Sequence, residues 1–182
     1  MGQGTLATAY LGDTIWAYRM YKALGDGAIA QVADADLHTL VDPDANSIAI
    51  IVQHVAGNLR SRFADFLTSD GEKPDRDRDA EFEMPEQMSR DQILESWNVA
   101  WSVAMASIEA LTYEDLERTV YIRGEAFLVV EALNRSVTHT AYHVGQIVTL
   151  ARHFASSSWK SLSIPRGQSA EFMRGAFKSS NP

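Results

Sequence analysis

Apolar residues recur every three or four positions along four long stretches of the chain, which is the spacing of one buried face on an α-helix. These stretches predict helices over about residues 10–33, from residue 46 or 47 to about 66, from 89 to about 111, and over about 127–154. No stretch shows the alternation of a β-strand with similar strength. We therefore expect an all-α fold in which amphipathic helices bury their apolar faces against one another.

The segments between these helices carry local signals of their own. Ser47 and a capping box over 89–92 predict the starts of the second and third helices. Residues 69–86 are polar and charged, which favours a long solvated loop, with a lid over a site as the alternative. Residues 119–124 look extended and are typical of a short hairpin. Spaced apolar residues over 159–168 predict a C-terminal tail that docks on the helices.

The composition limits the class of protein. A chain of 182 residues with 46% hydrophobic residues suits one globular domain over 1–182. No apolar run approaches the roughly 20 residues of a membrane span, and residues 1–5 lack a basic secretory signal, so we expect no membrane partner and a cytoplasmic location. The net charge of −8, with basic and acidic residues interleaved over 73–79, argues against nucleic acid as a partner. The lack of cysteine excludes disulfides, thiolate ligands and a cysteine nucleophile.

Three histidines are the clearest candidates for chemistry. His139 and His143 lie four residues apart in the fourth predicted helix, so their imidazoles leave the same face. His54 lies among apolar residues in the second predicted helix. If the fold brings these helices together, the imidazoles can bind one divalent metal ion and leave coordination positions open, as catalytic centres do. Because a histidine pair at this spacing is more often a surface or core feature than a ligand pair, a purely structural role is the alternative.

Residues near these histidines suggest supporting roles. Asn58 and Gln146 each follow a candidate ligand by about one helical turn. We expect Asn58 to orient a ligand or a metal-bound water, and Gln146 to contact bound water or substrate. Gly57 and Gly145 each cost roughly 1 kcal/mol inside a helix, which predicts close packing or room beside the site.

Other assignments fail on the residues present. A zincin-type protease needs glutamate directly after the first histidine of the pair, and Thr140 stands there. The sequence has no phosphate-binding glycine loop, no nucleophile elbow and no pair of Glu-x-x-His motifs as in ferritin-like di-iron proteins. His38 lies in a polar stretch expected to be exposed, and His153 lies near a helix C-terminus, so we assign neither to the metal.

A histidine in the second helix followed by His-x-x-x-His-x-x-Gln in the fourth resembles the DinB-like (DNA-damage-inducible) superfamily of bacterial helical bundles. The residues that carry this resemblance are His54, His139, His143 and Gln146. Three further segments are similar to an uncharacterised subfamily of that superfamily, namely residues 53–60, 68–74 and 159–169. The resemblance covers almost the whole chain.

The resemblance implies an up-down four-helix bundle with an unusual helix order, often as a homodimer. It implies a long loop between the second and third helices, a short extended segment before the fourth and a docked tail. It also implies a divalent metal ion (nickel, zinc or iron) on His54, His139 and His143. Characterised members of the superfamily include bacillithiol S-transferases and mycothiol-dependent isomerases, and others are described as metal-dependent hydrolases.

Three functional hypotheses follow from these observations. The leading one is a metal-dependent transferase that directs an external low-molecular-weight thiol at an electrophilic small-molecule substrate, since the chain has no thiol of its own. In it the three histidines are ligands, and Asn58 and Gln146 are supporting groups. The alternatives are a hydrolase that uses metal-bound hydroxide as its nucleophile, and a non-catalytic metal-binding stress-response module whose coordination positions are all filled.

Overall fold

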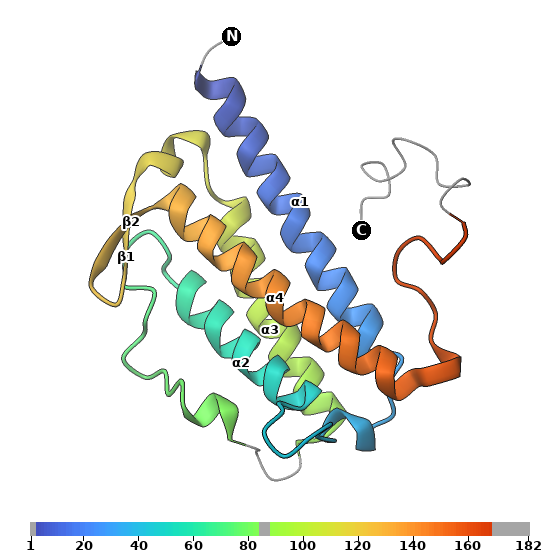
Figure 1. Cartoon of the computed structure of the whole chain (residues 1–182). Coiled ribbons are helices and arrows are strands. Elements are labelled where there is room, and N and C mark those ends of the chain that lie inside the picture. Colours follow the sequence, from blue (N-terminus) through green and yellow to red (C-terminus); the bar gives the residue numbers. More distant parts are fainter. Residues whose placement is uncertain (1–2, 84–87, 169–182) are drawn as a thin grey trace.

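The computed structural model describes residues 3–83 and 88–168. Within them the fold is mostly helical, with four long helices and a small two-stranded sheet (Figure 1). The helices are α1 (Gln3–Ile29), α2 (Ile48–Phe63), α3 (Arg90–Glu109) and α4 (Val129–Ala155). The predicted all-α fold is confirmed. None of the described helices is long and apolar enough to cross a lipid bilayer.

The helices pack in the order α1, α4, α2, α3 around the bundle, so that each helix has two principal neighbours. α1 and α2 therefore lie diagonally opposite one another, as do α3 and α4, whereas α2 and α3 pack side by side. α1 and α4 run in one direction, and α2 and α3 run in the other (Figure 1). The directions do not alternate as in a simple up-down bundle, because the long connection between α2 and α3 returns the chain to the end at which α2 began. This order places α2 directly beside α4.

Two helices begin at the residues that the sequence predicts. Ser47 accepts a hydrogen bond from the backbone N–H of Ile50 (3.2 Å) ahead of α2. Ser89 and Gln92 form the reciprocal bonds of a capping box ahead of α3. Each contact satisfies backbone N–H groups that the first helical turn leaves without a partner. α1 differs from the prediction, because it begins well before residue 10.

Aromatic side chains from three helices fill the centre of the bundle. Tyr18, Phe63, Trp97 and Trp101 are fully buried and pack edge to face. The indole N–H of Trp97 donates to Oδ1 of Asp26 (2.7 Å), so the buried ring keeps a partner for its polar atom. This cluster ties α1, α2 and α3 together.

A β-hairpin and the loop that follows α2 lie together at one side of the bundle (Figure 1). The strands of the hairpin are β1 (Thr119–Ile122) and β2 (Glu125–Leu128). They are antiparallel, so the predicted hairpin is confirmed. The turn residues Arg123 and Gly124 both have positive φ angles (57° and 76°), as a type I′ turn requires. The Asp70 carboxylate accepts hydrogen bonds from both backbone N–H groups (2.8 and 2.7 Å). The loop is thus fastened to the hairpin.

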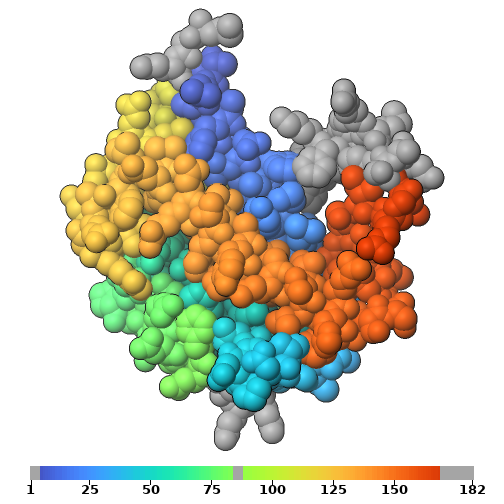
Figure 2. Space-filling model, viewed as in Figure 1, coloured from blue at the N-terminus to red at the C-terminus, as the bar shows by residue number. Residues whose placement is uncertain are grey.

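The C-terminal tail docks on the bundle, as predicted, in the part that the structure describes. Trp159 and Leu162 pack against the hydrophobic core, and the Gln31 side chain bonds a backbone N–H and a backbone C=O of the tail (2.7 and 3.2 Å). Figure 2 shows the tail beside the ends of α1 and α4. Residues 84–86 of the predicted loop and residue 169 lie outside the described residues.

Gly25 in α1 lets the buried indole of Trp97 approach the helix backbone. A Cβ added there would lie 2.6 Å from a ring carbon of Trp97. Gly25→Ala is therefore expected to lower the free energy of unfolding by about 1–3 kcal/mol, because the close-packed ring cannot move without strain. Gly12→Ala in the same helix is the control, since its Cβ meets open space and should be neutral or stabilising. Urea denaturation measures both, and equal stabilities would contradict this packing.

Asp70 makes the stability of the fold depend on pH. The backbone N–H of Glu72, aided by those of Gly124 and Arg123, holds the pKa of Asp70 below its ordinary value of 3.8. A carboxyl whose pKa falls on folding stabilises the fold above pH 3.8, and this contribution is lost as the pH drops below that value. Asp70→Asn should therefore unfold at a lower temperature than the parent near neutral pH, with a gap that narrows in acid. Thermal unfolding across pH measures the gap, and a constant gap would refute the assignment.

Candidate metal centre

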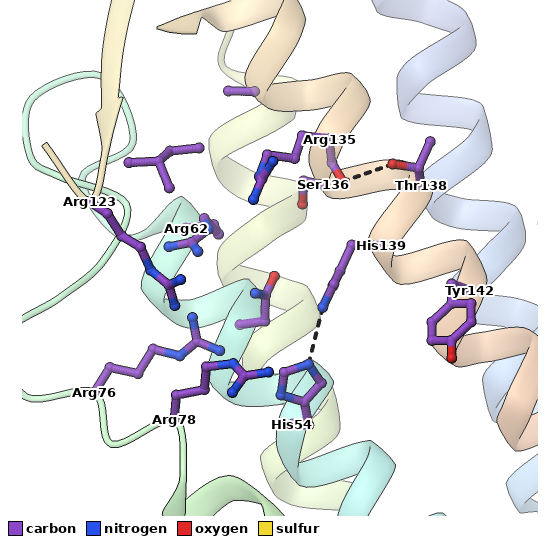
Figure 3. Close-up of a pocket in the computed structure, with 13 residues that line it drawn as sticks. His54, Arg62, Arg76, Arg78, Arg123, Arg135, Ser136, Thr138, His139 and Tyr142 are labelled. Atoms are coloured by element: carbon purple, nitrogen blue, oxygen red, sulfur yellow. Dashed lines mark hydrogen bonds between the residues drawn. The ribbon is translucent and has the colours of Figure 1, made fainter. Parts of the chain in front are cut away.

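α2 and α4 bring together three histidines that are far apart in the sequence. His54 comes from α2, and His139 and His143 come from successive turns of α4. One ring nitrogen of each lies within 4.8 Å of those of the other two. The Nε2 atoms of His54 and His139 are 3.1 Å apart (Figure 3). Two nitrogens bound to one tetrahedral ion at 2.0–2.1 Å would be roughly 3.3 Å apart. The cluster therefore has dimensions that fit a divalent metal ion.

Hydrogen bonds on the outer side of two rings determine which nitrogen faces the cluster. Nδ1 of His54 donates to Oε2 of Glu81 (2.8 Å), and Nδ1 of His143 donates to Oε1 of Gln146 (2.8 Å). Because a neutral imidazole carries one proton, Nε2 of each ring keeps a free lone pair. Nδ1 of His139 is buried and has no partner among the described residues. Outer hydrogen bonds of this kind are typical of metal-binding histidines.

Burial keeps two of the imidazoles neutral. Burial, followed by the neighbouring His143 and His54, lowers the pKa of His139 from 6.5 to about 3. Burial also lowers the pKa of His143, although its hydrogen bond with Gln146 opposes the change. Metal binding requires deprotonated imidazoles. His139 and His143 are thus in the form that binds a cation at neutral pH.

Glu81 is the supporting residue that the sequence did not reveal. It lies in the short 3-10 helix η2 (Ala80–Phe82), within the loop after α2, and it is buried. Arg76 contacts both of its carboxylate oxygens (2.8 and 2.9 Å), and His54 contacts one. Burial opposes ionisation of this carboxyl, but the hydrogen bonds from His54 and Arg76 outweigh it and lower the pKa of Glu81. The predicted solvated loop is therefore buried where it reaches the histidines.

Gly57 in α2 gives this carboxylate access to His54. A Cβ added at Gly57 would lie 2.1 Å from Oε1 of Glu81, so a larger residue would displace it. Phe82 packs on the His54 ring, with 4.5 Å between the ring centroids. The predicted close packing is thus found at Gly57. It is not found at Gly145, where an added Cβ would meet open space.

The two predicted supporting residues lie in different places. Asn58 is buried and lines the same cavity as two of the histidines, where a ligand can reach it. Gln146 instead bonds the outer nitrogen of His143, because a side chain one turn further along α4 reaches that side of the ring. Gln146 therefore orients a candidate ligand, and its contact with bound water or substrate stays a prediction.

A cavity of about 490 Å³ lies beside the cluster (Figure 3). His54, Asn58 and His139 form part of its wall. Over residues 3–83 and 88–168, the cluster contains no fourth histidine or carboxylate. A small molecule in the cavity can therefore approach the point at which the imidazoles converge.

The two remaining histidines stay outside the cluster, as predicted. His38 is half-buried instead of exposed, since its Nε2 lies 2.9 Å from the carbonyl oxygen of Met88. His153 is exposed in the last turn of α4. Neither ring is near the other three histidines.

Fold and cluster together define a class of protein, a helical bundle with a three-histidine group compatible with a divalent metal ion. Residues 5–168 match the model of the family described as Protein of unknown function (DUF1572), and the chain belongs to that family. Comparisons with curated proteins and with solved structures gave no match. The matched residues include all three histidines, Glu81 and the cavity wall.

Gly57→Ala is expected to weaken zinc binding by about 10–100-fold, because it displaces the carboxylate that orients His54. Calorimetric titration of metal-free protein with zinc measures the change. Gly145→Ala in α4 is the matched control, since its Cβ meets open space and it should leave the zinc affinity unchanged. Equal zinc affinities in the two variants would contradict the role assigned to Glu81.

Proposed function

We propose that this protein is a metal-dependent enzyme of the DinB-like superfamily that transfers a low-molecular-weight thiol to an electrophilic small molecule. His54, His139 and His143 would hold the divalent ion, which is nickel, zinc or iron. The observation that carries the proposal is the convergence of these imidazoles beside a cavity, with outer hydrogen bonds that direct the Nε2 lone pairs of two of them inward.

The superfamily assignment is supported by order and position. One histidine on the second helix and two on the fourth, followed by Gln146, match the motif that the resemblance rests on. Because α2 and α4 are neighbours, the residues of this motif on the two helices lie close together. Homodimerisation, which the resemblance also implies, is part of the same proposal.

The cavity favours catalysis over metal storage. A non-catalytic module needs a closed coordination shell and no space beside it. Here a volume of about 490 Å³ adjoins the histidines, and its wall carries the polar side chain of Asn58. A volume of this size, with polar side chains in its wall, is within the range of small-molecule sites.

The lack of cysteine favours an external thiol as the nucleophile. A divalent ion on three neutral imidazoles supplies, when bound, a Lewis acid that stabilises a thiolate near neutral pH. The chain's own part is to keep the imidazoles neutral and oriented. Glu81 and Gln146 hold two of the rings, and Asn58 offers hydrogen bonds to a molecule in the cavity.

His143→Ala is expected to remove most of the bound metal while leaving the helical content unchanged, because the side chain is only half-buried and contributes little to the core. Elemental analysis of protein purified without a histidine tag measures the metal, and circular dichroism measures the helices. His153→Ala, an exposed histidine on the same helix, is the control and should keep its metal. Equal metal content in the two variants would count against the assigned ligands.

Thiol-dependent consumption of electrophiles distinguishes the transferase from its alternatives. Metal-loaded protein should consume members of an electrophile panel only when a low-molecular-weight thiol is added, since the chain supplies none. Chromatography of the products should show the thiol adduct. Turnover without thiol would identify a hydrolase instead. If no electrophile is consumed with or without thiol, the non-catalytic module is favoured.

A further inference from the structure

Arginine dominates the wall of the cavity beside the histidines. Five of the chain's 16 basic residues line this cavity, and none of the described acidic residues does. The five are Arg62, Arg76, Arg78, Arg123 and Arg135. The chain as a whole has a net charge of −8, so this local positive charge runs against the overall balance.

Two of the five arginines have a structural role. The side chains of Arg62 and Arg76 are only 12% and 5% exposed. Arg62 pairs with Glu72 (3.0 Å), and Arg76 pairs with Glu81 (2.8 Å). Their charges are compensated within the loop, and they hold the loop against α2.

The other three arginines are exposed and come from three separate segments. Arg78 lies in the loop, Arg123 in the hairpin turn and Arg135 on α4. The guanidinium of Arg78 lies over the ring of Phe82 (5.2 Å), and that of Arg135 lies over the ring of Phe127 (5.9 Å). An aromatic ring positions a guanidinium without neutralising it. The charges of Arg78 and Arg135 are therefore held in position and remain available to bind an anion.

Nearby carboxylates do not cancel the charge of these three side chains. Glu72 contacts Nε of Arg123 (3.1 Å), but it is shared with the two structural arginines. Asp79 reaches Arg78 only at 3.7 Å, in an exposed pair of little strength. In the described part of the chain, Arg135 forms no ion pair with a carboxylate. The mouth of the cavity is therefore positively charged.

We infer that this cavity binds an anionic small molecule, with its carboxylate or phosphate group between Arg123 and Arg135 and its reactive part toward His139. The inference rests on the proposed function, because the anion belongs to the substrate or to the thiol. Figure 3 shows Arg123 entering from the hairpin and Arg135 from α4. Guanidinium groups bind carboxylate and phosphate through paired hydrogen bonds. A volume of about 490 Å³ suits a metabolite.

Calorimetric titration of metal-free protein tests the anion site separately from the metal. The chelator is itself an anion, so it is removed by desalting before the titration. Succinate and inorganic phosphate are the two anionic probes, and succinamide is the neutral control of similar size. Saturable binding of at least one anion, without binding of succinamide, is expected. The anion with the higher affinity shows whether carboxylate or phosphate is preferred.

Arg135→Gln should weaken the binding of that anion at least tenfold, because charge-assisted hydrogen bonds are lost. Arg152→Gln, an exposed arginine in the last turn of α4, is the matched control and should bind as the parent does. Arg135→Lys, which keeps the charge but not the paired geometry, should be intermediate. Thermal unfolding of each variant establishes that it is folded.

Three results would overturn the inference: equal binding of succinate and succinamide, no binding of either anion, or equal losses in the Arg135→Gln and Arg152→Gln variants. The proposed function fails on a different result, which is protein that takes up none of zinc, nickel and iron(II). Anion binding by such protein would support the anion site alone, and uptake of one of these metals without anion binding would support the metal centre alone.

Discussion

The contact between α2 and α4 is the constraint on which the candidate site depends. These helices are not consecutive, and His54 meets His139 only because the crossover after α2 makes α4 the neighbour of α2. Three imidazoles held this closely would repel one another if protonated, and burial keeps His139 and His143 neutral. The fold thus assembles three imidazole donors, two of them kept neutral by burial, where it could have placed apolar side chains. Buried polar side chains make a core less stable than apolar ones would, but imidazole nitrogens are good ligands for a metal cation.

The loop between α2 and α3 connects every other part of the site. Asp70 fastens the hairpin turn, which carries Arg123 to the cavity. Glu72 holds the arginines of the loop and of the hairpin together. Glu81, further along, reaches across Gly57 to orient His54. A single connection therefore couples the geometry of the metal cluster to the shape and charge of the cavity.

The sequence revealed the features that depend on local geometry. Helix spacing and the caps at 47 and 89 follow from neighbouring residues, and so does the pairing of His139 with His143. The role of Glu81 could not be predicted, because it is one carboxylate in a charged run and only the path of the loop selects it. Gln146 was identified, but its direction toward His143 depends on side-chain geometry in α4. The arginine-lined cavity was missed because its residues come from distant segments.

X-ray absorption spectroscopy of the zinc-loaded protein tests the central claim most directly. The structure predicts scattering from three imidazoles, with nitrogens at about 2.0–2.1 Å, and one or more lighter ligands that do not come from the chain. Two imidazoles or fewer around the zinc, or a shell completed by protein carboxylates, would contradict a three-histidine centre that is open to the cavity.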